Sequence, residues 1–201
     1  MEKNPVERWC GPVVHAFSLV AGYAVLAITL VIGAEILLRR VFGMSLQGAD
    51  EYGGYMLAIV TAIGAAHALL DRAHTRIEIL VERLPQGARA VLNVASALVM
   101  AAMAAFLAWR AVVAMLESIE YQSVSTSPLM TPLWMPQAAW VAGMILFAVV
   151  ASVVALHALS LTVGNWRAIN RWYGIKTLSE ELDEATAEVE PQGLATREAR
   201  A

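Results

Sequence analysis

The stretch YGGYMLAIVTAIGAAHALLDRAHTRIEILVERLP, residues 52–85, joins a long apolar run to a segment dense in charged side chains. The apolar run, residues 52–70, contains no Asp, Glu, Lys or Arg. A helix rises about 1.5 Å per residue, so about 20 residues of this kind cross the hydrocarbon core of a bilayer. The run therefore predicts a membrane-spanning helix that ends where the charged segment begins.

Three further apolar runs, at residues 13–38, 88–116 and 137–163, approach or exceed the same length. Hydrophobic residues make up 59% of the 201-residue chain and charged residues only 15%, too little polar surface for a soluble domain of this size. We therefore predict an all-α membrane protein with four transmembrane helices in a domain over residues 1–176. An acidic, partly disordered tail follows at 177–201. The first run is too long for a signal peptide, and we expect it to be retained.

The charged segment after residue 70 has the pattern of a short amphipathic helix. Its apolar residues recur at i, i+3, i+4 and i+7 from Ile77 to Leu84, which places them on one helical face. Pro85 ends the pattern before the third run begins. We predict an interfacial helix over residues 74–84, between the second and third spans, that lies flat in the membrane surface. Three charged side chains would hold it there: Arg76, Glu78 and Arg83.

The basic residues near the span ends predict the orientation of the chain. Nine Lys and Arg residues would lie on one side of the membrane and only Arg39 and Arg40 on the other. Basic residues are enriched on the cytoplasmic side, so both termini are expected there. The connection at residues 117–136 contains no Lys or Arg, as expected for an exported loop.

The first exported connection ends in the acidic pair Asp50 and Glu51. Carboxylates at the start of a helix complement its dipole, and Asp50 is a candidate N-cap of the second span. Arg39 and Arg40 lie within reach across a short loop. The four side chains therefore allow two interpretations, helix capping or docking onto a partner protein.

The second exported connection contains Pro128, Pro132 and Pro136 at intervals of four residues. This spacing excludes a regular helix through the loop and favours an extended backbone, with Pro136 in the first turn of the last span. Tyr121 and Trp134 are typical interfacial anchors. The connection could serve as a docking platform or as an ordinary ordered connector.

Two ionisable residues fall inside predicted spans. Glu35 and Arg110 lie at similar depths toward the exported side. Charges in hydrocarbon are costly, so we expect Glu35 and Arg110 to pair, to face a partner protein, or to reach the headgroups. Small residues at intervals of four predict helix packing faces: Ala58, Ala62 and Ala66 in the second span, and Ala97, Ala101 and Ala105 in the third.

His15, His67 and His157 fall toward the cytoplasmic ends of three spans. Two such residues at matching depth could ligate a b-type haem, which would make the chain a membrane anchor of an oxidoreductase. Hydrogen bonding near the interface is the simpler interpretation. The chain carries no GxSxG, HExxH, CxxC or phosphate-loop motif. We therefore expect neither an enzyme nor a metal or cofactor site in this chain, with haem as the alternative.

Several motifs occur together, in a fixed order, in RRVFGMSLQGADEYGGYMLAIVTAIGAAHALLDRAHTRIEIL, residues 39–80. Arginine and an FGxS turn follow the first span, an acidic pair opens the second, and a His-x-Arg-Ile-Glu segment runs from His74 to Glu78. The proline-bearing PLMTPLWMPQ, residues 128–137, precedes the fourth span. In these features residues 15–165 resemble the small membrane subunit of tripartite ATP-independent periplasmic (TRAP) transporters. Thr75 departs from the pattern, since an aliphatic residue is usual there.

The resemblance implies a function that spacing alone does not. TRAP transporters are bacterial inner-membrane systems that import small organic anions, often carboxylates, with a sodium gradient. A periplasmic binding protein delivers the substrate to a large permease subunit that holds the sodium and substrate sites. The small subunit would then be a scaffold for the large subunit and a docking surface for the binding protein. On this basis the exported residues named above and the interfacial helix are candidate contacts with partner proteins or lipid.

Overall fold

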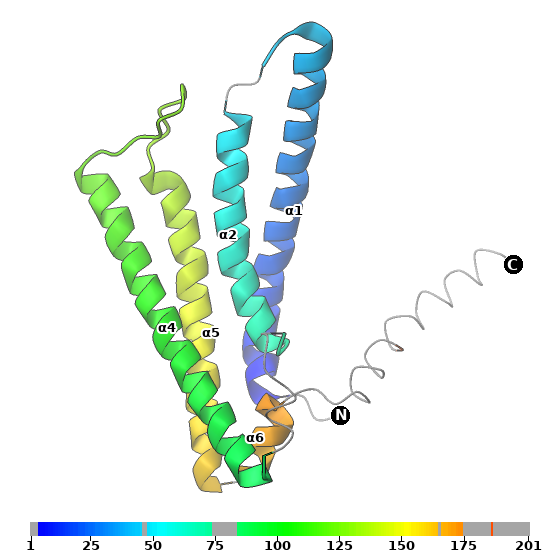
Figure 1. Cartoon of the computed structure of the whole chain (residues 1–201), viewed down its shortest axis with the longest axis vertical. Coiled ribbons are helices and arrows are strands. Elements are labelled where there is room, and N and C mark those ends of the chain that lie inside the picture. The colour runs from blue at the N-terminus through cyan, green and yellow to red at the C-terminus, as the bar shows by residue number, and fades with distance from the viewer. Residues whose placement is uncertain (1–3, 46–47, 74–83, 165, 175–185, 187–201) are drawn as a thin grey trace, which may run out of the picture.

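Four long helices make up most of this computed structural model, which describes residues 4–45, 48–73, 84–164, 166–174 and 186. They are α1 (Pro5–Phe42), α2 (Ala49–Leu70), α4 (Gln86–Glu120) and α5 (Trp134–Gly164), with a short α6 (Trp166–Tyr173) after them (Figure 1). All four are long and apolar enough to cross a membrane. The predicted all-α membrane fold with four spans is confirmed. The predicted interfacial helix lies outside the described residues except for its last residue, Leu84.

The helix ends follow from local chemistry. At the start of α1, Pro5 occupies the first helical position and the Asn4 side chain accepts a hydrogen bond from the Val6 amide at 3.1 Å. Gly43, with φ 65°, ends α1 in the left-handed conformation that glycine adopts without strain. Pro85 immediately precedes α4.

The helices form a row in the order α4, α5, α2, α1 (Figure 1). Each helix of the row packs against the next, and α1 makes a smaller contact with α5. The short α6 packs against α4 and α5. The start of α1 and the short α6 lie where the helix axes end on one side, which we call the terminal end of the molecule. The α1–α2 and α4–α5 connections lie at the opposite ends of the helices, which we call the loop end.

Small residues line the contacts within the row, and in α4 the predicted Ala97 and Ala101 are partly buried against the core. Ala62 and Ala66 of α2 are buried as predicted, whereas Ala58 is exposed. In α4, Ala104 and Ala108 are buried and the predicted Ala105 is exposed. A strict four-residue spacing turns away from one face of a 3.6-residue helix, whereas alternating steps of three and four stay on it.

Helices α5 and α2 approach each other closely at Gly143. A Cβ atom added to Gly143 would lie 3.0 Å from Ala62 Cβ and 3.3 Å from Ile63 Cγ1. Lipid provides no hydrophobic drive for helix association, so close backbone contact of this kind supplies the packing energy. Gly143 and Ala62 therefore join the two helical hairpins, α1–α2 and α4–α5.

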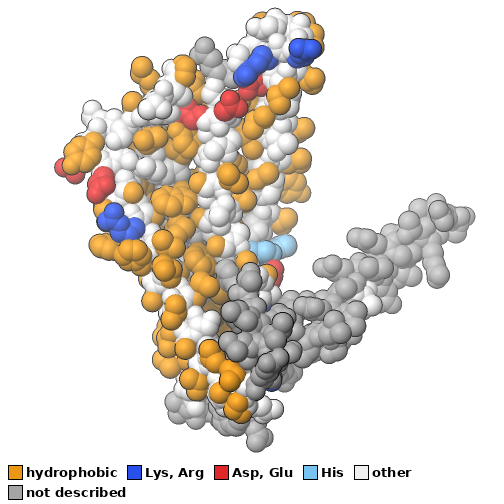
Figure 2. Space-filling view, in the orientation of Figure 1, with side chains coloured by type: hydrophobic (Ala, Val, Ile, Leu, Met, Phe, Trp, Pro, Cys, Tyr) orange, Lys and Arg blue, Asp and Glu red, His pale blue; other side chains and the backbone are white. Residues whose placement is uncertain are grey.

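Exposure differs greatly along the row. Of the most apolar 18-residue window in each helix, 44% of α5 is buried but only 6% of α1. Apolar side chains cover much of the visible surface of the helices (Figure 2). Such a row requires lipid or another membrane protein on its faces.

Candidate functional site

The loop end carries a carboxylate that joins the start of α2 to the α4–α5 connection. Glu51 lies in the first turn of α2, where the helix dipole favours negative charge. One of its oxygens accepts a hydrogen bond from the Tyr55 hydroxyl at 2.5 Å. The other accepts a hydrogen bond from the Ser127 hydroxyl of the α4–α5 connection. Glu51 thus ties α2 to a segment 76 residues away along the chain.

The α4–α5 connection is itself a narrow, ordered hairpin. Val124 and Pro132 form an isolated antiparallel bridge. The flanking hydrogen bonds run from the Ser125 amide to the Thr131 carbonyl at 2.9 Å and from the Leu133 amide to the Ser123 carbonyl at 3.0 Å. These bonds make Val124 and Pro132 a non-hydrogen-bonded pair, so the missing N–H of Pro132 leaves no ladder bond unmade. The predicted extended backbone is confirmed at this pair.

The tip of this hairpin packs on the start of α2. Gly48 precedes α2 with φ 93°, a conformation that favours glycine. A Cβ atom at Gly48 would lie 2.0 Å from Cδ1 of Leu129, so glycine is required both for its conformation and for this contact. We call the surface formed by the α4–α5 hairpin, residues 121–133, and the start of α2, residues 48–55, the loop-end platform.

A second polar cluster lies at the end of α1 and consists of Glu35, Arg39 and Ser45. Glu35 is buried, with 3% of its surface exposed, and forms a salt bridge with Arg39 one turn later. The Ser45 hydroxyl donates to the same Glu35 oxygen at 3.1 Å. Ser45 thereby ties the residues after α1 back onto the helix, and the Arg39 guanidinium remains more than half exposed.

The charged residues predicted for the loop end occupy separate places. Asp50 is not the N-cap of α2, because the helix begins at Ala49 after Gly48 and no side chain caps it. Asp50 is instead an exposed residue of the first turn, and Arg40 is an exposed residue of the last turn of α1. The structure does not bring Arg39 to Glu51: the former contacts Glu35 and the latter Ser127.

The predicted aromatic and proline residues of the second connection lie on the platform or beside it. Tyr121 directly follows α4 and is 74% exposed. Pro128 is exposed near the hairpin tip. Trp134 is the exposed first residue of α5, and Pro136 lies in its first turn as predicted. Arg76, Glu78 and Arg83 lie outside the described residues.

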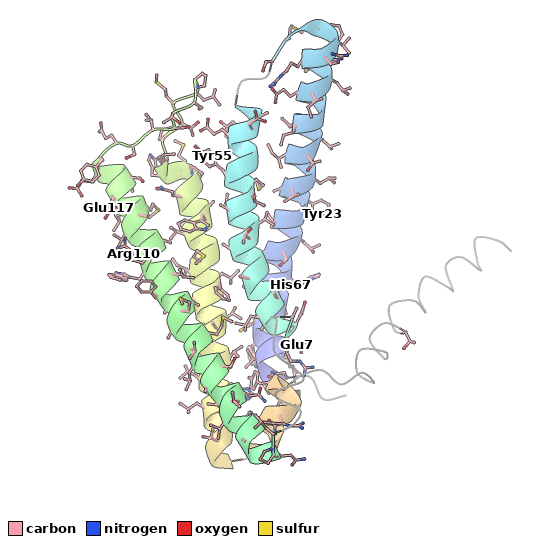
Figure 3. All side chains as sticks on the ribbon, viewed as in Figure 1. Glu7, Tyr23, Tyr55, His67, Arg110 and Glu117 are labelled. Atoms are coloured by element: carbon pink, nitrogen blue, oxygen red, sulfur yellow. The ribbon has the colours of Figure 1, made fainter. Side chains whose placement is uncertain are left out.

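Glu35 and Arg110 do not meet in the structure. Glu35 takes Arg39 as its partner, whereas Arg110 is exposed on α4, at the opposite edge of the row (Figure 3). The Arg110 guanidinium carbon lies 5.8 Å from the centroid of the Trp109 ring. Pairing was one of three interpretations of these charges. For Arg110, an exposed guanidinium on a spanning helix leaves the other two, contact with a partner protein or with the lipid headgroups.

Polar contacts at the terminal end were not predicted from the sequence. The amide of Asn93 on α4 donates to Asn170 of α6 at 3.0 Å, and Asn170 donates to the Gln86 carbonyl at 2.9 Å. His157 Nδ1 and the hydroxyl of Tyr173 are hydrogen-bonded. Burial raises the pKa of Tyr173 to about 12, so the phenol is neutral at physiological pH. An Asn inside an apolar run was the available signal for the first of these contacts.

Within the described ranges, no three His, Cys, Asp or Glu side chains come together in a way that could hold a metal ion. The site is therefore an ordered surface of hydroxyls, carboxylates and apolar tips at the loop end. It presents hydrogen-bonding groups and apolar side chains on one surface.

The family of tripartite ATP-independent periplasmic transporters, DctQ component, matches residues 28–161. No curated protein matches the chain at a significant level. The matched range starts within α1 and ends within α5, so it contains both connections of the loop end and the whole platform. Since the match covers more than half of the 201 residues, the chain belongs to the DctQ component family of tripartite ATP-independent periplasmic transporters.

Proposed function

We propose that this chain is the small membrane subunit of a sodium-driven importer of small organic anions, mostly carboxylates. It supports the large permease subunit within the membrane and offers the loop-end platform to a periplasmic binding protein. Sodium and substrate bind the large subunit, and this chain holds no cofactor. Its contribution is surface and rigidity, and it catalyses no reaction.

The row of helices supports the scaffold part of the proposal. The exposed surface of the row is largely apolar, and among the described helices α1 packs mainly against α2. Packing one face against a large permease would bury this surface and leave the other face to lipid. The close contact of Gly143 on α5 with α2 would keep the two helical hairpins in the same plane while the permease moves.

The observation that carries the docking part is the bond between Glu51 and Ser127. It joins the start of α2 and the distant α4–α5 connection into one surface at the loop end. A binding protein needs such a preordered surface, because a loose loop would lose conformational entropy on docking.

Localisation in a bacterial inner membrane with both termini in the cytoplasm completes the proposal. Arg39 and Arg40 are the basic residues at the loop end, whereas Arg8, Arg72 and Arg89 lie at the terminal end. This asymmetry favours a cytoplasmic terminal end and a periplasmic platform. The alternative of a haem-bearing anchor is less well supported, because the matching family is a transporter component.

The test is uptake by the assembled complex in proteoliposomes at increasing concentrations of binding protein. Ser127→Ala removes the hydroxyl that holds Glu51, so we expect half-maximal uptake to require more binding protein. The large subunit should still co-purify with the variant. Glu120→Gln, an exposed carboxylate at the same end of the molecule, is the matched control and should behave as the wild type. An unchanged concentration dependence for Ser127→Ala would refute the docking role of the platform.

A further inference from the structure

A trough runs along the groove between α1 and α2 at the terminal end, and its two parts differ in chemistry. The polar part, about 450 Å³, is lined by Glu7, Arg8, His15, His67 and Asp71 among others. Next to it lies an apolar part of about 420 Å³, which shares both histidines. Because both histidines line both parts, the two parts are adjacent, and we call them together the α1–α2 trough.

The apolar part extends from the histidines toward the middle of the membrane-spanning helices. It is lined by Leu19, Tyr23 and Leu26, of which Tyr23 is 71% exposed. Gly22 lies among them as an exposed residue, and a Cβ atom there would meet nothing within 4 Å. In Figure 3, Glu7, His67 and Tyr23 succeed one another along α1 and α2 from the terminal end inward. The trough thus passes from charged to apolar in the direction of the membrane normal.

The polar part holds both signs of charge in accessible positions. His67 Nε2 lies 3.2 Å from Asp71 Oδ2, and the two side chains are 42% and 51% exposed. The rings of His15 and His67 are 6.4 Å apart between centroids, and Glu7 and Arg8 are exposed. Two carboxylates, one guanidinium and two imidazoles therefore face the same space. The group that complements them needs an anion for Arg8 and the histidines, and a cation for Glu7 and Asp71.

The order of these features matches that of one kind of molecule in a membrane. A phospholipid places a phosphate at the interface and its acyl chains along the apolar helices. A cation in its headgroup would complement Glu7 and would share Asp71 with His67, whose Nε2 lies 3.2 Å from the Asp71 carboxylate. A primary ammonium donates up to three hydrogen bonds to carboxylates, whereas a quaternary ammonium donates none. These requirements together select a zwitterionic phospholipid with a primary amine.

We propose that the α1–α2 trough binds one phospholipid with a phosphoethanolamine headgroup. The phosphate contacts Arg8 and the imidazoles, and the ammonium contacts Glu7 and Asp71. One acyl chain follows the trough past Gly22. The bound lipid fills the groove between the two helices at the less buried edge of the row. This inference requires only that the helices span a membrane and is independent of the proposed role in transport.

Native mass spectrometry of the full chain in mild detergent tests the proposal. Phosphatidylethanolamine, phosphatidylglycerol and phosphatidylcholine with identical acyl chains are added in turn at several concentrations. We expect one tightly bound phosphatidylethanolamine per chain. Its affinity should exceed that of the other two lipids by about fivefold, which is the range of a few exposed charge contacts.

Three variants sharpen the result. The double variant Glu7→Gln with Asp71→Asn should abolish the preference for phosphatidylethanolamine over phosphatidylcholine. The matched double variant Glu117→Gln with Glu120→Gln, which alters two exposed carboxylates toward the loop end, should retain it.

The third variant, Gly22→Phe, should weaken the binding of all three lipids equally, because its side chain occupies the acyl part of the trough. Equal affinity for the three lipids would overturn the proposal. So would a preference that persists when both trough carboxylates are neutral.

Discussion

Replacement of Gly143 by larger residues should separate the two helical hairpins in proportion to the size of the new side chain. The added Cβ lies 3.0 Å from Ala62 Cβ and 3.4 Å from the Ile63 amide nitrogen, whereas carbon atoms in contact prefer about 3.5–4.0 Å. Gly143→Ala therefore requires a small shift of α5 against α2. Gly143→Leu adds three further carbon atoms in the same place and requires a much larger shift.

The expected magnitudes follow from two opposing effects. Alanine is more favourable than glycine inside a helix by about 1 kcal/mol, and overpacking costs about 1–3 kcal/mol. Gly143→Ala should thus lower the free energy of unfolding by about 1 kcal/mol or less, and Gly143→Leu by about 3 kcal/mol. The double variant Gly143→Ala with Ala62→Gly moves the small residue across the contact and should recover most of the loss.

The assay is unfolding of the full chain in mixed micelles with increasing sodium dodecyl sulfate, followed by tryptophan fluorescence. Gly64→Leu is the matched control: Gly64 lies on α2 near the same contact but is exposed, and a Cβ atom there meets nothing within 4 Å. The control should stay within about 0.5 kcal/mol of the wild type. If Gly143→Leu is no more destabilising than Gly64→Leu, the close contact of α2 with α5 does not hold the row together.

Three further predictions concern the ends of the row. Gly48→Ala should impair uptake at low binding-protein concentration, because its Cβ would displace Leu129 from the platform; Leu129→Ala in the same chain should partly restore it, and no recovery would contradict the contact. Arg39→Ala should lower the thermal stability, because it leaves the buried Glu35 without its charge partner. The double variant Arg39→Ala with Glu35→Gln should recover the stability, because it removes the unpaired charge. A double variant less stable than Arg39→Ala would contradict this explanation. The pKa of Tyr173 is raised from 10.0 to about 12 in the folded chain, so folding favours the protonated phenol. The stability it contributes is complete below pH 10 and is lost between pH 10 and about 12; Tyr173→Phe should remove this part of the pH dependence in chemical denaturation, and an unchanged slope would contradict the burial.

The spans could be predicted from the sequence because the bilayer imposes a length. Each predicted run lies inside one helix, since about 20 apolar residues are needed and lipid forbids unpaired backbone groups. The position of Pro136 in the first turn of α5 and the extended backbone at Pro132 could also be predicted, because proline restricts its own backbone. These are local constraints, and each acts on a few neighbouring residues.

The partners of the polar side chains could not be predicted in the same way. Glu35 pairs with Arg39 and not with Arg110, because a neighbour one turn away is always within reach, whereas Arg110 depends on the order of the helices. That order, with α1 and α4 at opposite edges, is not encoded in hydrophobicity. The bond of Glu51 to Ser127 likewise needs two hairpins to be placed side by side first.

The order of the helices also decides which small residues make the contacts between helices. In α2, Ala62 meets Gly143 of α5, a residue that was not among the small residues predicted to form packing faces. Such a contact becomes visible only when both helices are in place.

Uptake of radiolabelled organic anions by proteoliposomes tests the central claim most directly. The large subunit and the binding protein are reconstituted with and without this chain, under an inward sodium gradient. The account predicts uptake only when all three proteins are present, and none with this chain alone. Uptake by this chain alone, or equal uptake by the other two components in its absence, would contradict it.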